Sequence, residues 1–135
     1  MSRENVELVR RAYEEGYARR SVEGFSGLFA PGFRFHMRSE FPGVRPWYAL
    51  EELPQLWADL DETYTDYSLA PADFATFGAF VLVTLSARAR LRGSDAWVDE
   101  TLFHIWHLAD GRVLEAWTYG DEQEALDAIR QARER

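Results

Sequence analysis

The sequence predicts an α+β domain in which helices cover one face of a curved, largely antiparallel sheet. Helical spacing of apolar residues dominates the first 63 residues, apart from one short strand, whereas the alternation typical of strands dominates residues 64–119. A last helical segment follows after residue 120. Helices and strands that are separated along the chain in this way favour an α+β arrangement over alternating βαβ units.

The first two predicted helices lie at the N-terminus. In residues 2–20, apolar side chains recur every three to four positions and would form one buried stripe, made of Val6, Val9, Tyr13 and Tyr17. A shorter helix is predicted over residues 21–29, because Ser21 can cap its start and Pro31-Gly32 ends it.

A short strand and a third helix follow. The segment FRFHM, residues 33–37, alternates between two kinds of side chain, which is typical of a strand. Residues 39–47 contain two prolines and are predicted to be a loop. The third helix is predicted at about residues 49–63, with leucines and Trp57 on one side. Pro54 is compatible with it, because it lies near the first turn.

The second half of the chain predicts strands and a C-terminal helix. The strands are expected over residues 64–74, 79–91, 97–108 and 112–119. Asp110-Gly111 is typical of the turn of a hairpin between the last two. Asp121 and Glu124 resemble a capping box, so we expect a helix after them that buries Ala125, Leu126 and Ile129.

Composition excludes several classes of function. A chain of 135 residues without linker or repeat predicts a single domain over 1–135. A net charge of -8 argues against nucleic-acid binding. The absence of Cys and Lys excludes disulfides and Schiff-base chemistry. No stretch approaches 18 apolar residues and the N-terminus lacks an apolar leader, so we expect a cytoplasmic protein without a membrane span.

Two segments of the chain resemble a known family. RENVELVRRAYEEGYARRSVEGFSGLFAPGFRFH resembles the opening of SnoaL-like proteins, in the nuclear transport factor 2-like superfamily, and FHIWHLADGRVLEAWTYGDEQEAL resembles their closing hairpin and helix. The resemblance implies a cone-shaped, curved antiparallel or mixed β-sheet packed on three N-terminal helices, with a C-terminal helix and an internal pocket. This scaffold hosts polyketide cyclases, isomerases, epoxide hydrolases, dehydratases and non-catalytic binders, so fold alone does not assign a function.

The histidines of FHIWH do not have the spacing of a metal pair. His104 and His107 are separated by an odd number of residues, so on a strand they face opposite sides of the sheet. A zinc pair needs a spacing of two residues on a strand or four on a helix. We therefore expect no metal and no cofactor.

The hairpin turn decides what lies opposite His104. A two-residue turn would place it across from Trp117, whereas a turn with a glycine bulge would place it across from Ala116. We prefer the bulge, because it gathers on one face Leu102, His104, Trp106, Leu114, Ala116 and Thr118. By resemblance this face lines the pocket. The opposite face, often used for dimer contacts in the family, would hold Phe103, Ile105, His107, Val113, Glu115, Trp117 and Tyr119.

Two other strands are predicted to contribute to the pocket. One face of residues 79–91 is wholly apolar, includes Leu85 and would form a pocket wall. In FRFHM, Arg34 and His36 share a face that the resemblance directs into the pocket. The alternative is that the other face points to the core and His36 points elsewhere; that face holds Phe33, Phe35 and Met37.

The candidate chemistry centres on histidine. By resemblance, SnoaL-like cyclases carry a pocket histidine at the position of His104 and an acid/base aspartate at the position of Thr118. This chain has a threonine there, and a threonine hydroxyl cannot act as a general base near pH 7. His104 or His36 is predicted to be a general base, and Arg34 to pair with an anionic group or an enolate. The expected pocket residues are Tyr13, Tyr17, Trp57, Leu85, Leu102, Trp106, Ala116 and Thr118.

Three functions stay open at this point. The first is a cofactor-independent cyclase, isomerase or lyase that acts on a small hydrophobic carbonyl compound. The second is a non-catalytic binder of an apolar or aromatic ligand, and the third is a dimeric interaction module. The partners we expect are a small hydrophobic molecule and a second copy of the chain, bound through the sheet face.

Overall fold

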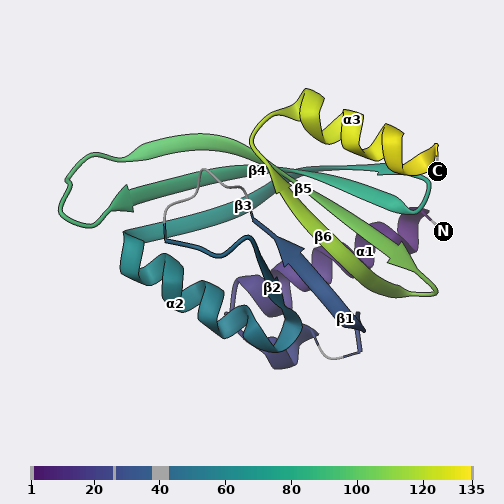
Figure 1. The fold of residues 1–135 in the computed structure, drawn as a ribbon, viewed down its shortest axis with the longest axis horizontal. Coiled ribbons are helices and arrows are strands. Elements are labelled where there is room, and N and C mark those ends of the chain that lie inside the picture. Colours follow the sequence, from purple (N-terminus) through teal and green to yellow (C-terminus); the bar gives the residue numbers. More distant parts are fainter. Residues whose placement is uncertain (1, 26, 38–42, 135) are drawn as a thin grey trace.

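The computed structural model describes residues 2–25, 27–37 and 43–134. Its strands are β1 (Phe29–His36), β2 (Trp47–Ala49), β3 (Tyr64–Phe77), β4 (Phe80–Leu91), β5 (Val98–Ala109) and β6 (Arg112–Tyr119). Its helices are α1 (Ser2–Arg11), the π-helix η1 (Ala12–Tyr17), the 3₁₀-helices η2 (Val22–Phe25) and η3 (Leu50–Glu52), α2 (Leu53–Thr63) and α3 (Glu122–Arg133). Figure 1 shows how these elements are arranged.

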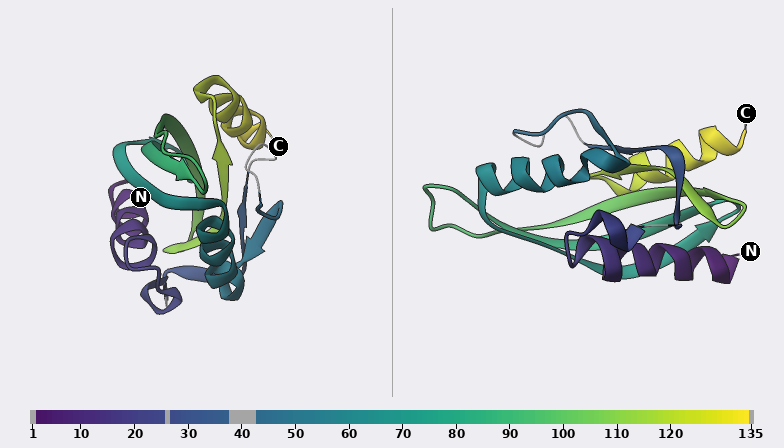
Figure 2. Two further views of the ribbon diagram at one scale, coloured as in Figure 1. Left: turned by 90° about the vertical axis from the view of Figure 1, so that its left-hand side faces the viewer. Right: turned by 90° about the horizontal axis from the view of Figure 1, so that it is seen from below.

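The strands form one six-stranded sheet in the order β2-β1-β6-β5-β4-β3. β1 pairs with β6 in parallel, and the other neighbouring strands pair antiparallel. The sheet is curved, with α1 and α2 on its concave side and α3 on the opposite side (Figure 2). This confirms the predicted α+β class, with a mixed, curved sheet on N-terminal helices and a C-terminal helix.

Each face of the sheet has its own apolar core. We call the face toward α1, η1 and α2 the inner face; its core includes Val9, Tyr13, Phe33, Phe35, Leu56, Leu85, Leu102 and Trp106. The outer face packs on α3 and has a smaller core of Phe80, Leu82, Phe103, Ile105, Ala125 and Ile129. The Asp121 carboxylate caps α3, as predicted, by accepting a hydrogen bond from the backbone N–H of Glu124 at 3.0 Å.

Several element boundaries differ from the prediction. The first helix is α-helical only to Arg11 and continues as η1, and the second is reduced to the single 3₁₀ turn η2. β1 begins at Phe29 because it pairs with β6 from that residue onward. The predicted loop over 39–47 includes residues 38–42 in part, which lie outside the described residues, and its last residue, Trp47, begins β2.

The β5–β6 hairpin has both a two-residue turn and a β-bulge, whereas the sequence suggested a two-residue turn and a bulged turn as alternatives. Asp110 and Gly111 have φ of 52° and 75°, so they form a two-residue type I′ turn, and Ala109 pairs with Arg112. The ladder then shifts by one residue after the Leu108–Val113 pair, so that His107 pairs with Glu115 and His104 with Thr118. The preferred glycine-bulge turn was therefore wrong.

The shift in the ladder nevertheless preserves most of the predicted faces. A β-bulge adds one residue to one strand and restores the alternation that the two-residue turn would have reversed. His104, Ala116 and Thr118 thus share the inner face, as predicted. The exception is at the bulge, where Val113 and not Leu114 belongs to the inner core.

In the described part of the chain, no helix is long and apolar enough to cross a membrane.

Candidate functional site

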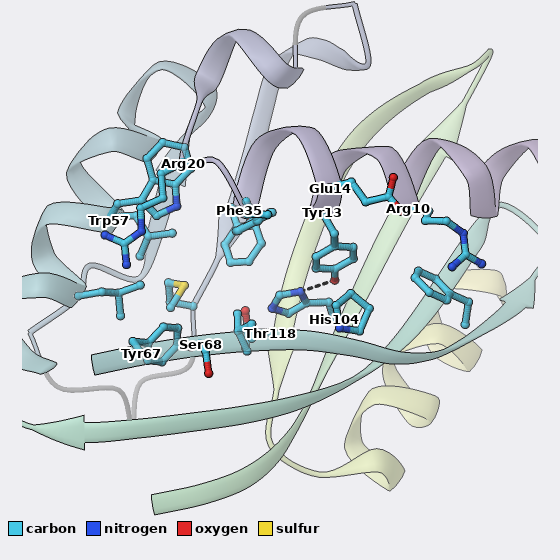
Figure 3. A pocket seen from close by; sticks show the side chains of 18 residues that line it. Arg10, Tyr13, Glu14, Arg20, Phe35, Trp57, Tyr67, Ser68, His104 and Thr118 are labelled. Atoms are coloured by element: carbon cyan, nitrogen blue, oxygen red, sulfur yellow. Dashed lines mark hydrogen bonds between the residues drawn. The ribbon is translucent and has the colours of Figure 1, made fainter. Parts of the chain in front are cut away.

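A pocket of about 470 Å³ lies between the inner face and the N-terminal helices (Figure 3). Its walls are mainly aromatic and aliphatic and include Tyr13, Tyr17, Phe35, Leu56, Trp57, Tyr67 and Phe74. His104 from β5 and Thr118 from β6 are buried polar residues of its lining. The charged residues among its lining are Arg10, Glu14 and Arg20.

The π-helix η1 positions one wall of this pocket. The backbone N–H of Ala18 donates to the carbonyl of Tyr13 at 2.9 Å, five residues back instead of the four of an α-helix. The wider turn brings Tyr13, Tyr17 and Ala18 to the same side, and all three line the pocket. π-Helical turns are rare and occur frequently at functional sites.

A buried hydrogen-bond chain fixes the imidazole of His104. The indole Nε1–H of Trp106 can only donate, and it donates to the hydroxyl oxygen of Tyr13 at 2.9 Å. The same hydroxyl lies 2.6 Å from Nδ1 of His104. If the Tyr13 proton is donated to Nδ1, the indole N–H, the hydroxyl and Nδ1 each have a partner. The reverse arrangement leaves the buried Tyr13 proton without an acceptor.

Burial keeps the imidazole and the phenol of this hydrogen-bond chain neutral. His104 is 2% exposed, and burial lowers its pKa to about 3. Burial also raises the pKa of Tyr13 well above its ordinary value, so the phenol keeps its proton. A neutral imidazole that accepts at Nδ1 carries its proton at Nε2. His104 is therefore a hydrogen-bond donor at its second nitrogen, and Figure 3 shows its ring between Tyr13 and Thr118.

Thr118 is the second polar group on the pocket floor. It pairs directly with His104 across the β5–β6 ladder and is 7% exposed. Its hydroxyl oxygen is buried and has no hydrogen-bond partner within the described residues. An unpartnered buried hydroxyl costs about 1–3 kcal/mol, which a ligand with a polar group could recover.

Four predicted pocket residues lie beneath the pocket and do not line it. They are Leu85, Leu102, Trp106 and Ala116, all buried in the inner core. The face predicted for these residues was correct, but helices pack directly on this stretch of the sheet. The rings of Tyr13 and Trp106, for example, pack edge to face with their centroids 5.4 Å apart. Tyr13, Tyr17, Trp57, His104 and Thr118 do line the pocket, as the sequence predicted.

Arg34 and His36 face away from the pocket, so their predicted placement was wrong. His36 Nε2 lies 2.5 Å from a carboxylate oxygen of Glu115, and its ring stacks on Trp117, both on the outer face. The guanidinium of Arg34 lies 4.2 Å from the ring of Trp47. The alternative reading of FRFHM holds because burying the phenylalanines removes more apolar surface from water than burying Arg34 and His36 would.

Sequence reasoning missed the charged rim and the wall from β3. Arg10 and Glu14 lie one helical turn apart on the face that carries Tyr13 and Tyr17, which was an available signal. The β3 wall changes its alternation at a bulge between Pro71 and Asp73, so alternation alone does not find Phe74. Arg20 falls three residues after Tyr17 in the predicted helix, although in the structure the helix ends at Tyr17 and Arg20 lies in the turn that follows.

Arg20 also has an unusual backbone. Its φ of 50° lies in the left-handed region, where a residue other than glycine is disfavoured by about 1–2 kcal/mol.

The described residues contain no group of three or more His, Asp or Glu side chains that could hold a metal ion.

Comparison with known proteins assigns the family. The sequence profile of the SnoaL-like domain matches residues 9–116. The chain belongs to the SnoaL-like family. Among curated proteins, none matches this SnoaL-like chain significantly in sequence.

Solved structures of similar fold cover nearly the whole chain. A nuclear transport factor 2-like protein of unknown function from Burkholderia pseudomallei is 20% identical over 93% of this chain and 97% of its own, with a TM-score of 0.73. TerC, co-crystallised with polyporic acid, is 20% identical over 94% and 98%, with a TM-score of 0.74. A putative SnoaL-like polyketide cyclase from Jannaschia is 24% identical over 93% and 91%, with a TM-score of 0.69. At these identities the likeness establishes the fold of this SnoaL-like protein alone.

Proposed function

We propose that the protein binds a small, largely apolar molecule whose oxygen acceptor meets His104 and Thr118 on the pocket floor. The observation that carries this proposal is the buried hydroxyl of Thr118, which has no hydrogen-bond partner among the described residues and lies beside an imidazole whose Nδ1 is already hydrogen-bonded. The volume of about 470 Å³ lies within the range of small-molecule sites. Aromatic walls with a few converging polar groups are typical of such sites.

The polarity of the floor favours a carbonyl or similar acceptor over a cation. His104 can donate from Nε2, and the Thr118 hydroxyl can rotate to donate as well. Neither group carries a negative charge that could compensate a desolvated ammonium group. Similarity to a protein co-crystallised with polyporic acid and to a putative polyketide cyclase supports a small organic ligand.

Catalysis is the second candidate, as a cofactor-independent cyclase, isomerase or lyase on a hydrophobic carbonyl compound. Donors fixed beside the carbonyl oxygen would stabilise an enolate that forms there. His104 is a poor general base in this arrangement, because its Nδ1 accepts from Tyr13 and its pKa is lowered to about 3. Glu14, the one carboxylate among the lining residues of the described chain, would then have to remove the proton.

Calorimetry with two matched ligands tests the binding proposal. We expect 2-acetylnaphthalene to bind and 2-isopropenylnaphthalene, which has the same shape without the oxygen, to bind about tenfold more weakly. Thr118→Val should reduce this difference, because it removes one donor and keeps the shape of the side chain. If neither compound nor a wider panel of aromatic ketones binds, the proposal is wrong.

Deuterium exchange separates binding from catalysis. An active site that enolises the bound ketone should catalyse exchange of its methyl protons in D₂O, measured by NMR. Glu14→Gln should abolish this exchange and leave the Kd of the ketone nearly unchanged. Binding without any catalysed exchange would favour the non-catalytic function.

We also propose that the outer face joins two copies of the chain. Trp47, His36 and Trp117 are paired in a row across β2, β1 and β6, and Trp47 is 38% exposed. Exposed rings beside charged side chains suit a partly polar interface. Light scattering at micromolar concentration should give a dimer mass for the native chain and a monomer mass for Trp47→Glu. A monomeric native chain would contradict this proposal.

A further inference from the structure

Arg20 is a charged group at the pocket whose placement the floor chemistry does not explain. It follows η1, where the backbone N–H of Arg20 donates to the carbonyl of Tyr17 at 3.3 Å and that of Ser21 to the carbonyl of Gly16 at 3.0 Å. A glycine is the common residue at such a left-handed helix end. Here the position carries an arginine instead, and its side chain lines the pocket.

The guanidinium of Arg20 is anchored at one nitrogen. One Nη lies 2.8 Å from both carboxylate oxygens of Asp61, on α2. No other hydrogen bond of this guanidinium is formed with the residues that the structure describes. Arginine has five N–H donors in a planar fork, so the edge with Nε and the second Nη stays open. The Arg20 side chain as a whole is 38% exposed.

The other charged lining residues are less suited to bind an anion. Arg10 lies 4.6 Å from the ring of Phe74 and 3.5 Å from the carboxylate of Glu7. Glu14 is itself negative. In Figure 3, Arg20 and Trp57 lie on one side of the pocket and Arg10 on the other, with His104 and Thr118 between them. Arg20 therefore offers an open cationic fork at one end, in a chain whose net charge is -8.

We propose that Arg20 selects ligands that carry a carboxylate at the end opposite the oxygen held by the floor. A carboxylate matches the planar fork of a guanidinium and can accept two parallel hydrogen bonds from it. Trp57 offers a flat apolar surface at the same end, so the ligand class becomes an aromatic acid with a second oxygen acceptor. This inference rests on the proposed function of the same pocket. Asp61 is then a positioning residue that holds the guanidinium in place.

The test compares 6-acetyl-2-naphthoate with 6-acetyl-2-naphthamide, which has the same shape but no charge. Calorimetry at pH 7 measures both Kd values for each protein, and their ratio cancels changes in folding that affect both ligands. For the native chain we expect the acid to bind about tenfold more tightly. Arg20→Gln should bring the ratio close to one, and Arg20→Lys should keep part of it through charge alone.

Two further variants control for structure. Arg20→Gly suits the left-handed backbone, so it should lose the preference for the acid without losing thermal stability. Arg19→Ala removes a neighbouring exposed arginine that does not line the pocket and should keep the native ratio. If the amide binds but the ratio of the two Kd values is unchanged in Arg20→Gln, or the native chain binds acid and amide equally, the inference is overturned. If neither compound binds, the proposed function itself fails.

Discussion

His104 and His36 are the same kind of residue on opposite faces of one sheet, and their surroundings differ in almost every respect. On the inner face, His104 is enclosed, neutral and hydrogen-bonded to a phenol. On the outer face, His36 is half-buried, hydrogen-bonded to the Glu115 carboxylate and stacked on Trp117. The difference shows that partner and burial, which strand parity decides, determine what each imidazole can do. The predictions below test this contrast.

Tyr13→Phe should have the largest effect on stability. The change removes the acceptor of Trp106 and the donor to His104 together, so two buried groups lose their partners. We expect the free energy of unfolding to fall by about 3 kcal/mol, measured by urea denaturation. Tyr119→Phe on the outer face is the matched control and should change it by less than about 0.5 kcal/mol. Equal losses in both variants would argue against the buried chain.

The second prediction concerns pH. Because burial lowers the pKa of His104 to about 3, the unfolded state binds a proton near pH 6.5 that the folded state does not. The stabilising contribution of the neutral ring is complete above pH 6.5 and declines as the pH falls toward 3. Between pH 6.5 and 5 the loss should be about 2 kcal/mol.

A comparison of variants isolates this contribution from that of the carboxyl groups. His104→Gln should show a correspondingly flatter dependence of unfolding free energy on pH over that range than the native chain does. NMR supplies a second check, since the ring signals of His104 should not move between pH 8 and 5. A His104 signal that titrates in this range would contradict the neutral chain.

Thr118→Val should stabilise the protein. It replaces a buried hydroxyl without a partner in the described structure by a methyl group of similar volume. We expect the free energy of unfolding to rise by about 1 kcal/mol, read from the midpoint of urea denaturation. Thr101→Val, at an exposed position of β5, should change it little. A loss of stability in Thr118→Val would mean that the hydroxyl already has a partner.

The smallest effect is expected on the outer face. His36→Ala removes a half-exposed pair with Glu115, and such pairs contribute at most about 1 kcal/mol. Because His36 lies across the sheet from the pocket, the Kd for 2-acetylnaphthalene should be unchanged. A clear loss of ligand affinity would show that the two faces are coupled through β1.

Much of this arrangement could be predicted from the sequence, and the failures have physical causes. Alternation assigned His104 and Thr118 to one face correctly, because the period of a strand is fixed. It could not locate the bulge at Leu114, since an added residue leaves no mark in an apolar pattern. Alternation also says which residues share a face but not which face is buried, and for Arg34 and His36 the resemblance pointed the wrong way.

The charged rim shows a different limit of sequence reasoning. Arg20 reaches the pocket from the turn that ends η1, so its placement depends on a left-handed backbone conformation that helical spacing does not predict. The pairing with Asp61 joins positions 41 residues apart, which a single sequence does not reveal. Such contacts become visible only once the helices are placed against the sheet.

The π-helix gives the pocket an unusual means of adjustment. Its five-residue hydrogen-bond step includes one residue more than an α-helical turn would. Removing a single residue from Ala12–Tyr17 would convert the segment to an ordinary helix and rotate everything after it, including Tyr17 and Arg20, relative to Tyr13. The anchor of His104 would stay while the far end of the pocket turned. The number of residues in η1 therefore sets the shape of this wall as much as its side chains do. A one-residue deletion would change the shape by moving several side chains together, which a substitution does not do.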